Sequence, residues 1–248
     1  EHEPLDVIAV PTTLTVVASL NHKVYIYDGS KSRYERLKNP SFTPKMVWLD
    51  PTLFTTLSEE SVRNTMSDVL IRAFDLLRQE VSPLHTDLSI QALRRIIRYG
   101  GEAAKTKDVQ SLSMVAYAHV LVGSLYVKKP YFPLHMLHDT VQGFHPELHY
   151  GRFLYFAGAS YIELQLDEMS PRMRTLLKSC FKNLGENTLT NAFRDFFEGL
   201  NQAGDDMKTD RTDTKYPEDY LVHLKVLFPK FASLKDQTVY RLIEDTML

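Results

Sequence analysis

The spacing of apolar residues changes near residue 56, and this change limits the folds open to the chain. Before it, three short runs rich in β-forming residues, at 6–10, 23–27 and 45–49, are separated by turn residues. After it, Val62, Met66 and Val69 begin a helical repeat that follows a capping Ser58. Three strands and a long helix are therefore predicted. Further helices are predicted over 88–105, 109–126, 133–142, 149–165, 171–184, 188–202, 217–230 and 236–247.

This order of elements predicts a mainly α protein with a small α/β part. Three strands are few for a sheet that must bury both faces, and no helix crosses over between them. We therefore expect residues 1–57 to be the remnant of an α/β domain and residues 58–248 to form an all-helical domain.

Composition excludes several classes of protein. The 248 residues are 44% hydrophobic, enough for a sizeable core, and the net charge of −2 gives no basic stripe for direct nucleic-acid binding. No apolar run is long enough to cross a membrane. The single cysteine, Cys180, fits a reducing, intracellular compartment. Because the chain begins at Glu1 and not at Met, we expect processing or trimming, and an organelle such as the mitochondrion is one expected location.

Four of the nine histidines, His135, His138, His145 and His149, lie within 15 residues. Imidazole is a common metal ligand, so the cluster indicates a metal site or the remains of one. His135 and His138 share one face of a helix. A break at Gly143 and Pro146 would let His149 return to them, whereas a continuous helix would carry it about 21 Å away.

Three stretches resemble the superfamily of iron-containing alcohol dehydrogenases, glycerol dehydrogenase and 3-dehydroquinate synthase. They are VIAVPTT at 7–13, PKMVWLDPTL at 44–53 continued by TTLS at 55–58, and MSDVL at 66–70 together with His135, His138 and HYG at 149–151. The resemblance implies a dehydroquinate synthase-like helical domain that follows a truncated nucleotide-binding sheet. It also implies a divalent iron or zinc ion held by Asp68, His135 and His149, with His138 as a possible substitute.

The chain departs from this family at two functional positions. Where members have a glycine-rich cofactor loop after Pro-Thr-Thr, residues 14–20 read LTVVASL, so no NAD(P) site is expected on this chain alone. Where some members supply another histidine, Arg72 stands one helical turn after Asp68 and can pair with it. Two interpretations stay open at this point, a residual metal site or a relic pocket in which Asp68 pairs with Arg72.

These departures predict a degenerate, non-catalytic relative, a pseudoenzyme that serves as a structural or interaction subunit of a larger assembly. Other protein subunits would be its partners, because an incomplete sheet exposes apolar surface and strand edges. The alternative is a metal-dependent NAD(P)-linked alcohol or polyol dehydrogenase whose missing cofactor-binding part lies outside this sequence.

Overall fold

The computed structural model describes residues 5–30, 33–125, 132–144, 150–182, 184 and 188–200. The chain divides into two compact units. The first unit comprises Glu1–Asp28 and Tyr34–Tyr131, and the second comprises Gly29–Arg33 and Phe132–Leu248. The predicted boundary between residues 57 and 58 stays a prediction.

Short strands and single helical turns make up the N-terminal part. Strands β1 (Ile8–Ala9) and β4 (Met46–Val47) form a parallel pair, with Ile8 opposite Met46 and Ala9 opposite Val47. Strands β2 (Lys23–Asp28) and β3 (Arg33–Lys38) form a second two-stranded sheet. The 3-10 helices are η1 (Val16–Leu20), η2 (Pro40–Phe42) and η3 (Pro51–Phe54). All three predicted strands are thus confirmed, with shorter bounds for two of them, and β3 was missed.

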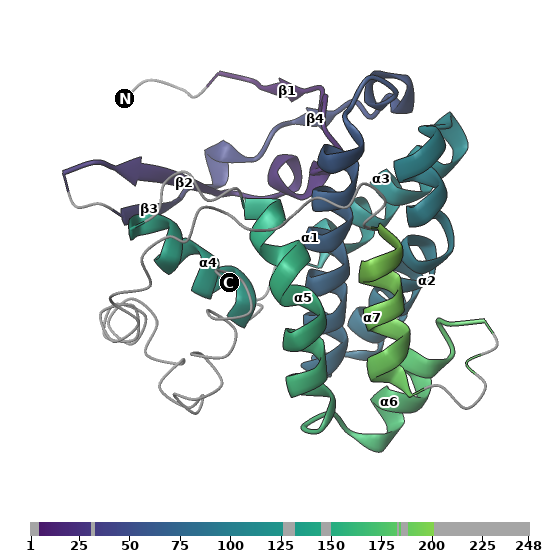
Figure 1. The fold of residues 1–248 in the computed structure, drawn as a ribbon. Coiled ribbons are helices and arrows are strands. Elements are labelled where there is room, and N and C mark those ends of the chain that lie inside the picture. The colour runs from purple at the N-terminus through teal and green to yellow at the C-terminus, as the bar shows by residue number, and fades with distance from the viewer. Residues whose placement is uncertain are drawn as a thin grey trace. The chain divides into compact units, whose positions relative to one another are not determined.

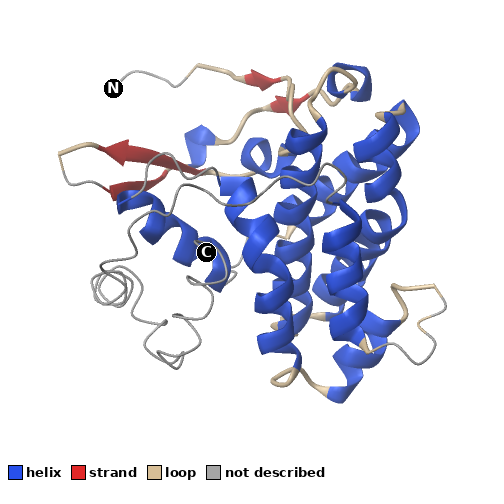
Figure 2. Cartoon of the chain, in the orientation of Figure 1, coloured by secondary structure: helices blue, strands red, loops and turns tan. Residues whose placement is uncertain are grey.

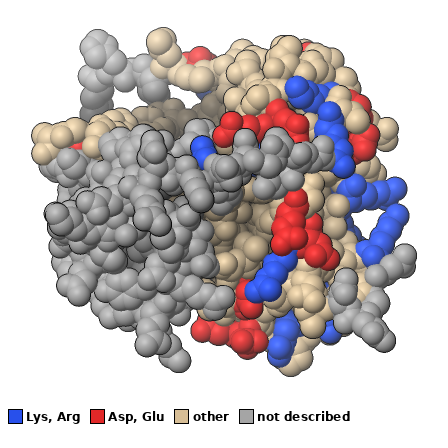
Figure 3. Space-filling view, in the orientation of Figure 1, with Lys and Arg blue, Asp and Glu red and all other residues tan. Residues whose placement is uncertain are grey.

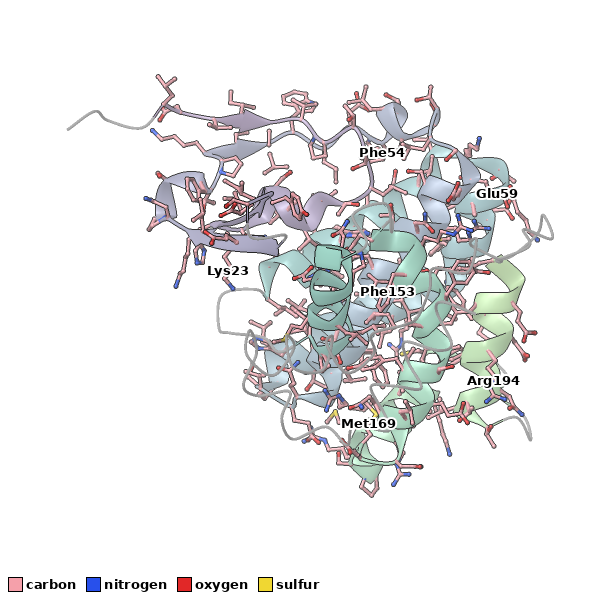
Figure 4. All side chains as sticks on the ribbon, turned by 60° about the vertical axis from the view of Figure 1, so that its left-hand side comes forward. Lys23, Phe54, Glu59, Phe153, Met169 and Arg194 are labelled. Atoms are coloured by element: carbon pink, nitrogen blue, oxygen red, sulfur yellow. The ribbon has the colours of Figure 1, made fainter. Side chains whose placement is uncertain are left out.

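Three long helices build the core of the first unit, α1 (Glu59–Arg78), α2 (Pro83–Thr106) and α3 (Val109–Ser124). Each begins after a capping side chain, from Ser58, Ser82 and Asp108 respectively. The three helices pack against one another, as Figure 1 shows. Phe54 at the end of η3 is fully buried, and Figure 4 shows it shortly before Glu59 at the start of α1. The predicted helices in this part are confirmed.

The second unit consists of helices in its described part: α4 (Pro133–Phe144), α5 (Tyr150–Leu166), α6 (Pro171–Lys178) and α7 (Leu189–Leu200). Helix α5 packs against both α4 and α7. The predicted helix over 171–184 is too long, because α6 ends at Lys178 and Ser179 follows as its C-cap. The helices predicted at 217–230 and 236–247 lie outside the described residues.

The predicted fold class is confirmed, since helices dominate and the strands form only a small part, as Figure 2 shows. None of the helices in the described residues has the length and apolar character needed to span a membrane. On the face drawn in Figure 3, basic and acidic side chains lie among one another across the described surface. This mixture agrees with the small net charge.

Candidate functional site

Asp68 lies in the middle of α1, in the interior of the first unit. Its neighbours in sequence Met66, Val69 and Leu70 are fully buried, and the Asp68 side chain itself is 2% exposed. Arg72, one turn later and 12% exposed, donates a hydrogen bond from Nε to Asp68 Oδ1 at 2.7 Å. The predicted pairing is confirmed. The pair is buried. Removing one partner of a buried ion pair strongly destabilises the folded protein, because the other charge is then left buried without it.

His119 on α3 is a buried histidine that the sequence analysis did not single out, and it lies within electrostatic range of the Asp68–Arg72 pair. It is fully buried, and the charges of Asp68 and Arg72 both act on its imidazole. The pKa of His119 is lowered from 6.5 to about 4, mainly because burial disfavours the charged imidazolium. The negative charge of Asp68 and a hydrogen bond with the Thr65 backbone oppose this shift, and the positive charge of Arg72 adds to it. The ring is therefore neutral at pH 7. Its spacing from Val115 and Val122, four and three residues away, was a signal that His119 faces the core.

His135 and His138 lie on α4 in the second unit. Their side chains are 6% and 0% exposed, and both rings lie against Tyr150, as expected for two residues on one helix face. That this face is buried did not follow from the sequence. The centroid of the His138 ring lies 4.6 Å from that of Tyr150 and 5.3 Å from that of Phe153, and both pairs are T-shaped. The His135 ring lies 5.4 Å from Phe132 and 5.5 Å from Tyr150. Figure 4 labels Phe153 on α5.

The His138 side chain makes ring contacts and no hydrogen bond with the described residues. Within the described part of the chain, neither of its ring nitrogens has a hydrogen-bond partner. Asp139 Oδ1 lies 3.7 Å from His138 Nδ1, beyond hydrogen-bond distance. Asp139 therefore does not orient this imidazole through a hydrogen bond. His145 and His149 lie outside the described residues.

Asp68 is the predicted metal ligand in the first unit, but its environment does not suit a metal ion. Arg72 already binds Oδ1, and a divalent ion about 4 Å from the guanidinium would meet a repulsion of about 8 kcal/mol at an effective dielectric constant of about 20. Among the described residues, no group of three or more His, Cys, Asp or Glu side chains could hold a metal ion. The joint ligand set of Asp68, His135 and His149 stays a prediction, because His149 lies outside the residues that the structure describes.

The segment where the cofactor loop was expected forms η1, and its apolar side chains enter the core of the first unit. Leu14 and Val16 are fully buried, and Val17 is 3% exposed. Helix η1 packs on α3. Helix η1 approaches α3 closely at Gly123, where an added Cβ atom would lie 2.6 Å from Cδ1 of Leu20. The segment is therefore fixed by its own side chains, and it lacks the glycines that let phosphate approach backbone amides.

Three solved structures illustrate what this architecture is similar to. Sulfoacetaldehyde reductase from Bifidobacterium kashiwanohense, solved with NAD+, matches with a TM-score of 0.80 and 15% identity over 98% of this chain and 65% of its own. NADH-dependent butanol dehydrogenase A from Thermotoga maritima gives 0.77 and 15% over 98% of this chain and 66% of its own. An iron-containing alcohol dehydrogenase from the same organism gives 0.75 and 16% over 100% of this chain and 65% of its own.

These likenesses concern the fold, since the identities are low. The chain spans about two-thirds of the length of these enzymes. No protein-family model matches it, and neither does any curated protein. The resemblance drawn from the sequence is confirmed at the level of structure: the chain has the fold of the iron-containing alcohol dehydrogenases.

Proposed function

We propose that this chain is a non-catalytic protein of alcohol-dehydrogenase fold that serves as a structural or interaction subunit of a larger intracellular assembly. The observation that carries the proposal is helix η1. Leu14, Val16 and Val17 occupy the core where a nucleotide-binding enzyme of this fold would need open backbone amides. Burial of these side chains stabilises the fold, and a segment held in this way cannot present its backbone amides to the phosphates of a dinucleotide.

One face of the pair formed by β1 and β4 supports a role in assembly. Ile8 and Met46 are opposite one another and are 62% and 52% exposed. Val10 and Trp48, two residues further on each segment, are 50% and 62% exposed. Side chains two apart share a face of an extended segment, so these four form one apolar surface, which we call the strand face. Parallel strands in proteins are normally covered on both faces, and a protein partner would supply that cover.

The expected partners are other protein subunits in a reducing compartment, for which the mitochondrion is a candidate. The single cysteine, Cys180, is buried and free, which suits such a compartment. Direct nucleic-acid binding is not part of the proposal, given the net charge of −2.

Calorimetric titration of the purified chain with NADH and NADPH tests this proposal. We expect no heat of binding, and no oxidation of alcohols with NAD+ or NADP+ in the presence of added Fe2+ or Zn2+. Saturable binding of either dinucleotide, or turnover above a heat-denatured control, would contradict a non-catalytic role. A stable monomer at micromolar concentration, which associates with nothing in its native source, would contradict the assembly role.

The second candidate function is a metal-dependent NAD(P)-linked dehydrogenase completed by residues outside this sequence. The observation that favours it is the buried face of α4, where His135 and His138 lie together. The metal would then polarise an alcohol or carbonyl oxygen of the substrate. Turnover in the same assay, lost on His135→Ala, is the result expected from this candidate.

A further inference from the structure

The backbone of β1 has one edge that β4 does not use. The carbonyl of Val7 accepts a hydrogen bond from the Lys45 amide at 2.9 Å. The carbonyl of Ala9 accepts one from the Trp48 amide at 2.8 Å. Successive residues of an extended strand direct their N–H and C=O groups to opposite edges, so these groups of Ile8 point away from β4. Within the described residues, β4 is the one strand that pairs with β1, as Figure 1 shows.

The sequence of β1 is typical of a strand inside a sheet. Residues 7–10 read VIAV, and strands that are buried on both faces have such continuous apolar runs. In the structure Val7 is 49% exposed on one face, and Ile8 and Val10 are 62% and 50% exposed on the other. Free edge strands are often protected by a charged residue or a proline, and residues 7–10 contain neither. Strand β1 thus has the sequence of an inner strand at the position of an edge strand.

We propose that the outer edge of β1 binds an extended, apolar segment of a protein partner, which adds to the sheet as a strand. The proposal rests on the interaction role proposed above and specifies the chemistry of the partner. The added strand exchanges backbone hydrogen bonds with Ile8. Its side chains lie beside Ile8 and Val10 on the strand face and beside Val7 on the other face, so they are apolar on both. A charged residue fits only at the end where Asp6 pairs with Lys45.

A peptide with the sequence KMVWLD, residues 45–50 of this chain, is the probe, because β4 with this sequence already pairs with β1. We expect the fluorescein-labelled, amidated peptide to bind the wild-type chain saturably in fluorescence anisotropy at concentrations up to about 1 mM. Two further forms, N-methylated at alternate residues, keep the side chains and each lose the amides of one edge. One form should bind and the other should not. No binding of the unmethylated peptide, or equal binding of all three, would overturn the proposal.

Two substitutions of Ile8 separate the edge from the strand face. Ile8→Pro removes the outward amide, and an edge strand tolerates a proline at a position whose N–H faces away from the sheet. Ile8→Thr keeps the amide and removes the apolar contact. We expect Ile8→Pro to weaken peptide binding by about tenfold or more, and Ile8→Thr by about fivefold at most. Equal losses in two variants that unfold at the wild-type temperature would overturn the proposal.

Amide hydrogen exchange of the wild type tests the same contact without a variant. The Ile8 amide should exchange rapidly in the chain alone and slowly with saturating peptide. An unchanged rate would overturn the proposal. So would a wild-type dimer that forms without peptide and that Ile8→Pro dissolves, because a second copy would then occupy the edge. A chain that binds neither peptide nor dinucleotide would lose this proposal and keep its non-catalytic role, whereas dinucleotide binding would contradict that role alone.

Discussion

His119 is an ionisable residue that the first unit keeps neutral by burial. Its pKa in the folded chain is about 4, against the ordinary value of 6.5, and the charges of Asp68 and Arg72 on α1 influence it in opposite directions. In the unfolded chain the same ring takes up a proton near pH 6.5. The folded state therefore binds fewer protons than the unfolded state between these two values, and acid favours unfolding there.

The expected consequence is a loss of stability on acidification. Between pH 6.5 and about pH 4, His119 should reduce the free energy of unfolding by about 1.4 kcal/mol per pH unit. Above pH 6.5 its contribution is fully present. Urea unfolding of the wild type and of His119→Leu at pH 7 and pH 5 measures this, because the difference between the two slopes isolates the imidazole. Equal pH dependence in both proteins would show that the ring can take up its proton in the folded chain.

Asp68 and Arg72 show how far a site can be predicted residue by residue. Their spacing of four residues on a helix predicted the pair correctly. Their burial was not predictable from α1 alone, because it depends on how α2 and α3 pack against α1. His119 was missed because one histidine at a core position of an apolar helix looks the same whether it packs or takes part in a cluster.

Helices α5 and α7 approach closely at Gly158. A Cβ atom there would lie 2.5 Å from Cζ of Phe197, whose backbone carbonyl accepts a hydrogen bond from the Tyr155 hydroxyl at 3.0 Å. Because the Phe197 ring is 4% exposed and packs against the Tyr155 ring, it has little room to move away, and we expect Gly158→Ala to destabilise the chain by about 1–3 kcal/mol.

Gly199 on α7 is the matched control, because nothing lies within 4 Å of its Cβ position. Gly199→Ala should stabilise the chain by about 0.5–1 kcal/mol through helix propensity. Thermal unfolding of both variants measures the contrast. Equal effects of the two substitutions would mean that α5 and α7 do not pack tightly at Gly158.

The start of α1 depends on Ser58. Its hydroxyl accepts a hydrogen bond from the Ser61 amide at 3.0 Å, as the sequence predicted, and Glu59 and Glu60 occupy the first turn. Ser58→Ala should cost about 1 kcal/mol in the free energy of unfolding, whereas Ser58→Asp keeps an acceptor and should cost less. Urea unfolding distinguishes the two. A loss of the same size in both variants would indicate that the hydroxyl matters for a reason other than capping.

Elements with a strong repeat were predicted well, and elements without one were not. Helices α1 to α5 and α7 show apolar residues at helical spacing. The segments predicted from this spacing are the ones that form helices in the structure, because the same apolar residues pack against neighbouring helices. Strand β3 was missed because its sequence, RYERLK, is dominated by charged residues and lacks an apolar alternation. The start of α2 was placed five residues too late, since Ser82 as cap with Pro83 in the first turn was overlooked.

At the scale of the molecule, the strand face is the surface that a partner would cover. Trp48→Glu places a charge on it, and Leu84→Glu places one at an equally exposed apolar position on α2, both being 62% exposed in the wild type. We expect proteins that co-purify with the wild type from its native source to be retained by Leu84→Glu and lost by Trp48→Glu. Both variants should unfold at the wild-type temperature, because neither position belongs to the core. Retention of the same proteins by Trp48→Glu would place the interface elsewhere.

Trp48 gives this surface an optical property as well. It is the single tryptophan among 248 residues, and it is 62% exposed on the strand face. All indole emission of the chain therefore originates at one known point in contact with water. A partner that covers this point will move the emission to shorter wavelength and shield it from a dissolved quencher. Association can thus be followed in the unlabelled protein, and a partner without tryptophan would leave the signal wholly that of Trp48.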